Sequence, residues 1–173
     1  MTDTSSRNPA EDVLASQAFS VFIGAEMTDF GDGNASMAID ILPHHLQQNG
    51  YVHGGVIAYL ADNTATFAGA TVLGPRVVTS ALTITYLRPG IGDKLVARAH
   101  VVDSTRRQAV VHVDVFAATT AAPAAEAFDE SSTGEAVDGA APAASAASAT
   151  AAAPTERRCA SAQATIVMLP EGR

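Results

Sequence analysis

The sequence predicts an α+β fold in which an antiparallel sheet surrounds one long helix. A helical pattern of apolar residues runs from residue 54 to about residue 71 and covers nearly every side of the helix, so most of its faces should be buried. Strand-like stretches stand on both sides of this helix, two before it and several after it. The short connections between the later stretches favour antiparallel pairing, because antiparallel neighbours need only a hairpin turn.

Before the helix, the sequence predicts a tail, a short helix and a hairpin. Residues 1–12 are polar and acidic, so we expect a disordered tail there, overlapping a short helix over residues 10–17. The apolar run at residues 19–27 predicts a strand, and the Asp- and Gly-rich segment at residues 29–34 predicts a turn. Apolar side chains alternate with polar or small ones over residues 35–42, which is typical of the returning strand of a hairpin.

After the helix, the alternation of apolar with small or polar residues predicts four more strands. They cover residues 76–88, 94–103, 108–118 and 159–169. Turn-forming residues separate the first three of these strands. We expect all four strands to pair in one sheet.

A segment of different composition stands before the last strand. Residues 118–155 consist almost wholly of Ala, Thr, Ser, Pro, Gly and acidic residues, with Phe128 and Val137 as the only large apolar side chains. Such a segment buries too little apolar surface to offset the entropy of ordering it, so we expect a disordered insertion. Closing a loop of this length costs only a few kcal/mol, so a single domain over residues 13–117 and 156–170 can accommodate it.

Charge limits the partners of the chain. The 173 residues carry a formal net charge of −8, which argues against nucleic acid or an anionic membrane as the main partner. The distribution is uneven: residues 118–155 hold five acidic side chains and no basic one, whereas residues 76–107 hold six basic side chains against two acidic ones. We therefore expect a basic patch on an otherwise acidic protein.

Cysteine and histidine usage limits the chemistry. Cys159 is the only cysteine, which excludes an intramolecular disulfide and a cysteine-rich zinc site. We expect it to be a small buried residue near the last strand rather than a catalytic thiol. His44, His45, His100 and His112 form no i, i+4 pair on a helix, so no metal site is expected.

The chain also lacks signals for a membrane. No apolar run reaches the ~18 residues of a membrane span. Residues 1–12 lack the basic and then apolar plan of a signal peptide. We expect a soluble cytoplasmic protein.

The most informative stretch is the loop at residues 47–55, which leads directly into the helix. Its glycines, Gly50, Gly54 and Gly55, permit backbone geometries and close approaches that a Cβ forbids. The helix terminus that follows presents free N–H groups and roughly half a positive charge. Asp62 then places a carboxylate in an otherwise apolar helix, which costs several kcal/mol unless the group is paired or used. An anion-binding terminus and an acid on one helix indicate a catalytic site.

The spacing of these residues resembles that of the hotdog-fold thioesterases, in particular the phenylacetyl-CoA thioesterase-like (PaaI-like) branch. The motif consists of Gly50-x-x-His53-Gly54-Gly55, Gln47 six positions before the histidine, and Asp62 nine positions after it. The segment at residues 79–89 also resembles the strand that follows the helix in this family. The likeness covers residues 19–117 and 158–169, and the Ala-rich insertion departs from the family plan.

The resemblance implies a hotdog fold and hydrolysis of an acyl-CoA thioester at sites shared between two subunits. The N–H of Gly54 would stabilise the carbonyl oxygen as negative charge develops on it. Asp62 would act either as general base on water or as nucleophile, and the sequence leaves both open. Gln47 would orient the thioester or the water. His53 would fix the loop by hydrogen bonding rather than act as an acid or base.

Other residues of the implied site follow by position. Thr79 would hold the water, although plain strand alternation puts it on the face opposite the main apolar row. We also expect Gly55 and Asn63 to contact the substrate. The basic excess offers Arg88 and the pair Arg106–Arg107 for the phosphates of coenzyme A, and a solvated surface explains these arginines equally well. No cofactor is expected apart from the coenzyme A of the substrate.

Spacing gives an independent reason for shared sites. Gly54 and Asp62 are eight residues apart, which is roughly 12 Å along a helix axis. One thioester carbon can hardly meet both groups from a single helix. Two such helices packed antiparallel would bring the Gly54 end of one near the Asp62 of the other, in a homodimer or a dimer of dimers.

The sequence gives less support to other functions. No Gly-x-Ser-x-Gly elbow and no phosphate-binding Gly-x-x-x-x-Gly-Lys-Ser/Thr occurs, which removes those serine hydrolases and nucleotide phosphatases. Hotdog hydratases share the fold, but their catalytic histidine with a nearby acid is not apparent. The main alternative is a non-catalytic acyl-CoA-binding protein whose insertion recruits a partner. The retained Asp62 favours the enzyme.

Overall fold

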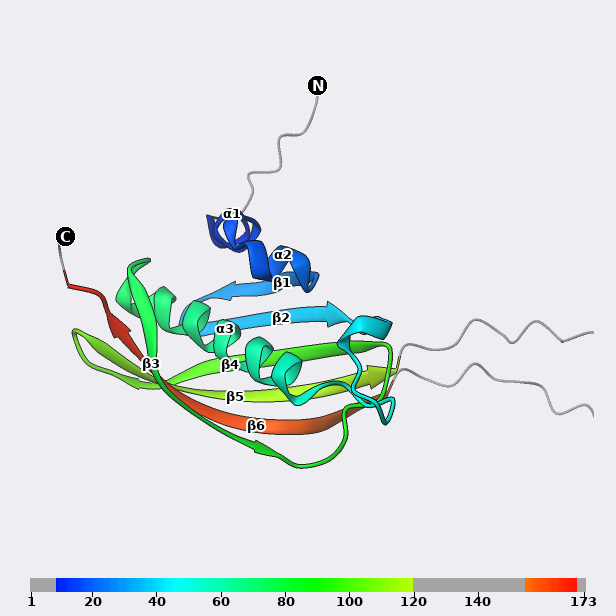
Figure 1. The fold of residues 1–173 in the computed structure, drawn as a ribbon. Coiled ribbons are helices and arrows are strands. Elements are labelled where there is room, and N and C mark those ends of the chain that lie inside the picture. Colours follow the sequence, from blue (N-terminus) through cyan, green and yellow to red (C-terminus); the bar gives the residue numbers. More distant parts are fainter. Residues whose placement is uncertain (1–8, 120–154, 171–173) are drawn as a thin grey trace, which may run out of the picture.

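The computed structural model describes residues 9–119 and 155–170 and consists of a curved, six-stranded antiparallel sheet wrapped around one long helix (Figure 1). The elements are α1 (Pro9–Ser16), α2 (Ala18–Phe22), β1 (Ala25–Gly31), β2 (Asn34–Asp40), the 3-10 turn η1 (Pro43–His45), α3 (Gly54–Leu73), β3 (Val77–Tyr86), β4 (Lys94–Ser104), β5 (Gln108–Thr119) and β6 (Thr155–Met168). The strand order is β1-β2-β4-β5-β6-β3, so β1 and β3 are the edges. The predicted α+β class is confirmed.

Helix α3 lies against the concave face of the sheet, as the apolar pattern predicts. Within α3 only Gly55 and Val72 are exposed, and the residues along one side of the helix are half-buried rather than fully buried. Strand residues facing α3 alternate with outward-facing ones and are often alanine, which lets the helix approach closely. Gly69 marks the tightest contact, since a Cβ there would lie 2.8 Å from the side chain of Ile166. The helix ends at Gly74, whose φ of +92° favours glycine.

The strand predicted over residues 19–27 is wrong. A short helix, α2, occupies its first part, and β1 begins only at Ala25, after Gly24 with a φ of +69°. A short apolar run does not distinguish strand from helix by itself. The helix is favoured over a strand here because it buries Ser20 within reach of two partners. The hydroxyl of Ser20 donates to Gln17 at 2.6 Å and accepts from Tyr59 at 2.7 Å.

The predicted turn between the first two strands is shorter than expected. β1 continues to Gly31, and only Asp32 and Gly33 form the turn. Both have positive φ, 49° and 79°, which is typical of a two-residue type I′ hairpin. Gly31 and Asn34 are therefore paired directly across it.

The ends of the chain and the insertion need two corrections. α1 begins at Pro9, so the tail predicted for residues 1–12 is too long, and residues 1–8 lie outside the described part. The predicted insertion falls mostly on residues 120–154, which are also outside it. Its outermost residues belong to strands instead, because Thr119 ends β5, Thr155 begins β6, and the two are cross-strand partners.

Candidate active site

The loop before α3 is held by its own backbone. The N–H of Gln47 donates to the carbonyl of Tyr51 at 2.8 Å, and the N–H of Gly50 donates to the carbonyl of Gln47 at 2.9 Å. Gly50 has a φ of +76°, which explains why glycine stands at this turn. The N–H of His53 donates to the carbonyl of His45 at 2.8 Å, which fixes the point where the loop enters the helix.

His53 is the N-cap of α3. Its Nδ1 accepts a hydrogen bond from the N–H of Gly55 at 2.9 Å, and its carbonyl accepts one from the N–H of Val56 at 2.9 Å. A Cβ on Gly55 would lie 3.0 Å from this Nδ1, so the cap itself favours glycine there. The N–H of Gly54 has no hydrogen-bond partner among the described residues. It is the amide at this terminus that remains available to a ligand.

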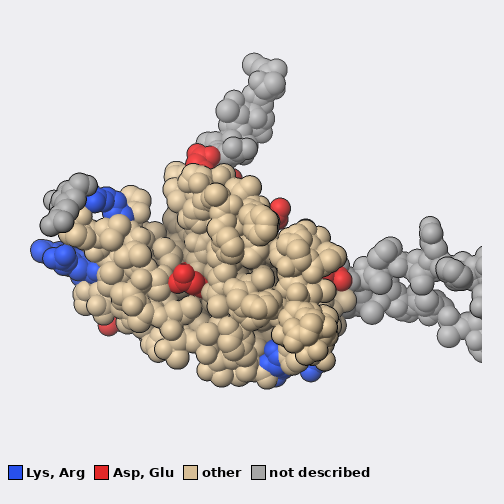
Figure 2. Space-filling view, in the orientation of Figure 1, with Lys and Arg blue, Asp and Glu red and all other residues tan. Residues whose placement is uncertain are grey.

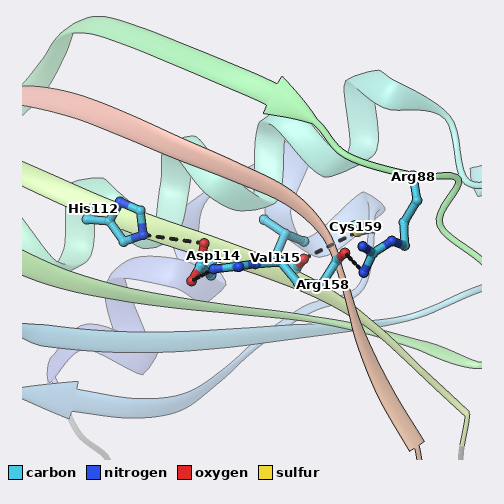
Figure 3. Close-up of polar contacts among 6 residues, drawn as sticks. All are labelled: Arg88, His112, Asp114, Val115, Arg158 and Cys159. Atoms are coloured by element: carbon cyan, nitrogen blue, oxygen red, sulfur yellow. Dashed lines mark hydrogen bonds and ion pairs between the residues drawn. The ribbon is translucent and has the colours of Figure 1, made fainter.

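A cleft opens beside Gly54. Gln47 and Gly55 also line it, together with Tyr86 and Arg88 from the end of β3 and the turn that follows. The hydroxyl of Tyr86 donates to the carbonyl of Gly54 at 3.0 Å. Arg88 is held at the rim by a 2.8 Å hydrogen bond from its guanidinium to the carbonyl of Arg158, which Figure 3 shows.

A second cleft contains Asp62. Phe19, Tyr59, Thr79 and Gly55 also line it, so Gly55 borders both clefts. Asp62 is half-buried, less than its place in an apolar helix suggests, but its Oδ1 is buried and has no hydrogen-bond partner in the described part of the chain. An unpaired buried carboxylate oxygen is costly, and in native proteins such a group usually has a function.

Thr79 faces α3, contrary to the alternation expected for its strand. The pairing of β3 with β6 shifts register between Thr79 and Ala81, which is the signature of a β-bulge. The extra residue, Ser80, turns Thr79 onto the helix-facing side, whereas Val78 is exposed. The Oγ1 of Thr79 lies 2.9 Å from the Oγ1 of Thr66. The bulge therefore brings Thr79 into the cleft of Asp62.

One chain does not unite the predicted catalytic residues. Gln47 and Gly54 lie in one cleft, and Asp62 and Thr79 lie in the other. The roughly 12 Å between Gly54 and Asp62 along the axis of α3 separates the two groups. Each cleft therefore holds only some of the predicted catalytic residues.

Asn63 lies in a polar cluster between α2 and α3. Its Nδ2 donates to the hydroxyl of Tyr59 at 3.0 Å, to Gln17 Oε1 at 3.2 Å and to Ser20 Oγ at 3.3 Å. Phe19 packs edge-on against Tyr59 with ring centroids 5.0 Å apart. The sequence did not indicate Phe19 and Tyr59 as site residues, because residues 19–27 were predicted to be a strand and Tyr59 to be core.

The basic excess over residues 76–107 does not form one patch. Arg88 lies beside the N-terminus of α3, whereas Arg106 and Arg107 lie in the β4–β5 turn. The carbonyl of Arg107 accepts from the N–H of Met168, which places this turn near the start of β3 at the other end of the sheet. Figure 2 shows basic side chains at two ends of the molecule, with the surface between them largely uncharged.

Two titratable groups outside the clefts, His45 and Cys159, are buried. Burial, followed by the nearby His44, lowers the pKa of His45, whose Nδ1 accepts from the N–H of Leu42 at 3.2 Å. Burial raises the pKa of Cys159, which is 0 % exposed in β6, as expected of an inert thiol (Figure 3). In the described ranges, no three His, Cys, Asp or Glu side chains are grouped to hold a metal ion, and no helix is long and apolar enough to cross a membrane.

Comparison with known proteins relates the domain to thioesterases. The model of the Thioesterase superfamily matches residues 49–124, from the glycine loop through α3 and strands β3 to β5. This part of the chain is therefore similar to the thioesterase superfamily. A thioesterase family protein of Silicibacter pomeroyi has a similar structure (TM-score 0.68, 20 % identity, 91 % of this chain and 93 % of that chain), and so does the Escherichia coli PaaI protein from the phenylacetic acid degradation operon (0.65, 17 %, 93 % and 91 %). The fold is therefore the hotdog fold.

Two curated relatives of this hotdog domain are candidate esterases. The protein from Halobacterium salinarum is 36 % identical over 88 residues, which are 47 % of this chain and 58 % of the relative. The protein from Haemophilus influenzae is 29 % identical over 104 residues, which are 59 % of this chain and 75 % of the relative. The chain thus spans little more than half the length of the halobacterial relative.

Proposed function

We propose that this protein is an acyl-CoA thioesterase of the phenylacetyl-CoA thioesterase-like branch, which hydrolyses a small aryl- or medium-chain acyl-CoA to the free acid and coenzyme A. The observation that carries the proposal is the buried Oδ1 of Asp62, which has no hydrogen-bond partner among the described residues, on a helix whose first N–H, that of Gly54, is also unpaired among them. A binding module has little use for such a carboxylate, since burying it costs several kcal/mol. The family match and the candidate esterases support the same class of reaction.

In this proposal Asp62 activates a water molecule. The water oxygen attacks the thioester carbonyl carbon while one of its protons passes to the carboxylate. The N–H of Gly54 and the positive end of α3 stabilise the charge on the carbonyl oxygen. The C–S bond then breaks, and the proton passes from the carboxylate to the thiolate of coenzyme A. Direct attack by the carboxylate, which forms an anhydride that water then hydrolyses, is the alternative.

The hydroxyls beside Asp62 are arranged to hold that water. Thr66 Oγ1 donates its only hydrogen to the carbonyl of Asp62 at 3.0 Å. In the hydrogen bond between the two threonine hydroxyls, Thr79 is therefore the donor and Thr66 the acceptor. The oxygen of Thr79 therefore keeps lone pairs that accept from a water. One water can then give one hydrogen to Thr79 and the other to Asp62. Gln47, in the other cleft, orients the thioester through its amide.

The complete site requires a second copy of the chain. Two α3 helices packed antiparallel set the Gly54 cleft of one subunit against the partner's Asp62, which gives two composite sites per dimer. The sheet supports this arrangement because β3 is an edge strand, open to pairing with another strand. Its neighbourhood is also unusually apolar for a surface: Val78, Tyr86 and Leu87 are 43 %, 50 % and 46 % exposed. Both the homodimer and a dimer of dimers fit this geometry.

Coenzyme A enters this proposal as part of the substrate, with no further cofactor. Arg88, at the rim of the Gly54 cleft, is the arginine best placed for a phosphate of coenzyme A. Arg106 and Arg107 lie at the end of the sheet opposite the Gly54 cleft of their own subunit. In an antiparallel dimer, this end of one subunit lies near the Gly54 cleft of the other. We also propose a cytoplasmic location.

Release of free thiol from a panel of aryl, short, medium and long acyl-CoAs tests the proposal. We expect turnover by the wild type and none by the Asp62→Ala variant, with the dimer intact in both by light scattering. The buried Cys159 leaves the background of a thiol reagent low. Wild-type activity in the variant would remove Asp62 from the mechanism. Binding of acyl-CoA without turnover by the wild type would favour the non-catalytic alternative.

A further inference from the structure

A third hollow, a cavity separate from the two clefts, lies beside the Asp62 cleft, between α1 and the C-terminal half of α3. Its volume is about 280 Å³, and it is more enclosed than either cleft described above. Val13 of α1, Phe30 of β1, and Phe67 and Ala70 of α3 line it with apolar surface. Its polar lining residues are Gln17 and Thr66. Nothing in the proposed hydrolysis uses this cavity.

The side-chain oxygens of Gln17 and Thr66 in the cavity are already hydrogen-bonded. The hydroxyl hydrogen of Thr66 goes to the carbonyl of Asp62, and the Oγ1 of Thr66 accepts from Thr79. Gln17 Oε1 accepts from Ser20 at 2.6 Å and from Asn63 at 3.2 Å. These oxygens therefore need no hydrogen bond from a ligand. The cavity suits an apolar group rather than a polar one.

The cavity lies next to the Asp62 cleft along α3. Thr66 lies one turn beyond Asp62, roughly 6 Å along the axis, and Ala70 lies one turn further. Thr66 lines the cavity and Thr79 lines the cleft, so their hydroxyl pair is the shared boundary. A group attached to a thioester carbonyl at Asp62 reaches the cavity only if it extends past this boundary.

We propose that this cavity receives the acyl chain, and that the substrate class is an unbranched, medium-chain acyl-CoA rather than a small aryl one. The inference rests on the proposed function and narrows it. A benzoyl or phenylacetyl group ends near Asp62, whereas a medium chain runs past Thr66 and buries its distal methylenes against Phe30, Phe67 and Ala70. Each buried methylene contributes roughly four-fold to kcat/KM, from ~0.8 kcal/mol of transfer free energy.

The assignment is tested by measuring kcat/KM for the wild type and three purified variants of the full chain. The substrates are a series of acyl-CoAs from butanoyl to dodecanoyl, together with phenylacetyl-CoA. For the wild type, kcat/KM should rise with chain length and level off when the cavity is full. Ala70→Leu fills the cavity, so the ratio of octanoyl to butanoyl kcat/KM should fall at least ten-fold. Phe30→Leu enlarges it, so the preferred chain should become longer. Ala15→Leu is the matched control, because Ala15 is exposed on α1 and outside the cavity, and its ratio should equal that of the wild type.

The outcomes separate the two proposals. An active wild type whose chain-length profile is the same in Ala70→Leu and Phe30→Leu overturns the cavity assignment and leaves the thioesterase in place. A wild type that prefers phenylacetyl-CoA to every linear chain does the same. A wild type inactive on the whole series overturns both. If Ala70→Leu fails to fold, as judged by its melting transition, the shift in Phe30→Leu decides.

Discussion

The Nδ1 of His53 accepts a hydrogen bond from the N–H of Gly55, two residues later, and this bond decides which amide of α3 is free. Because the N–H of Gly55 is used by the cap, the N–H of Gly54 remains for a ligand. In the proposed site the motif residues therefore have different tasks: His53 and Gly55 build the helix terminus, and Gly54 would present the hydrogen-bond donor.

The first prediction tests this donor by replacing its N–H with the ring nitrogen of proline, which has no hydrogen to donate. Proline is well accepted at the first position of a helix, and the residue before it must be extended, as His53 is with φ −62° and ψ 134°. Gly54→Pro should therefore preserve α3 but lower kcat by ~100- to 1,000-fold, the usual effect of losing one oxyanion donor. Steady-state kinetics on the best acyl-CoA, with melting temperatures, measure it.

Gly54→Ala is the matched control. It keeps the N–H, and its Cβ would lie 3.5 Å from the ring of Tyr86, an ordinary van der Waals contact. We expect kcat within a few-fold of the wild type. Equal activity of Gly54→Pro and Gly54→Ala would show that this amide does not stabilise the transition state.

The sequence predicts the parts of this site that depend on local spacing. The loop with Gly50 and the helix with Asp62 were identified because glycine turns and a 3.6-residue period are local signals. The face of Thr79 was not predictable, because a bulge at Ser80 reverses the alternation and depends on pairing with β6.

Tertiary contacts decided the remaining differences. Residues 18–22 form a helix rather than a strand because Ser20 finds its partners on Gln17 and Tyr59, and a linear pattern cannot show the latter. The division of the basic residues between two ends of the sheet likewise follows from strand order. Local pattern predicts most of the elements, whereas tertiary contacts decide the helical form of α2 and the faces of the strand residues.

The outer face of the sheet predicts a dependence of stability on pH. Asp114 accepts a hydrogen bond from Arg158 at 2.9 Å and lies 3.3 Å from Nε2 of His112, as Figure 3 shows. Burial by itself raises the pKa of Asp114, but hydrogen bonds from Ser161 and Arg158 and the nearby His112 outweigh burial and hold this pKa below its usual value. The folded state therefore favours the charged carboxylate.

The lowered pKa of Asp114 sets the direction in which stability changes with pH. A carboxyl group with a lowered pKa stabilises the fold above its unfolded pKa of about 4, and the stabilisation is lost as the pH falls through the folded pKa. Asp114→Asn should lower the melting temperature by roughly 2–4 °C at pH 7, and by progressively less below about pH 4. Calorimetry from pH 7 to pH 3 measures this. Asp29→Asn, on an exposed side chain of β1, should change nothing, and a pH-independent deficit in Asp114→Asn would contradict the charge-based explanation.

The last prediction concerns the Ala-rich segment. Thr119 and Thr155 are direct cross-strand partners, just as Gly31 and Asn34 are across the two-residue turn of Asp32 and Gly33. Replacing residues 120–154 with Asn-Gly should therefore close β5 and β6 into a type I′ hairpin.

Shortening a connection of this length removes roughly 2–3 kcal/mol of closure entropy, so the melting temperature should stay level or rise and turnover should be unchanged. A variant that carries residues 120–154 in scrambled order controls for composition. If the deletion lowers the melting temperature by many degrees while the scrambled variant behaves like the wild type, the segment contributes to the fold through its composition rather than its order. If both variants fall together, it contributes through specific contacts that its low apolar content does not predict.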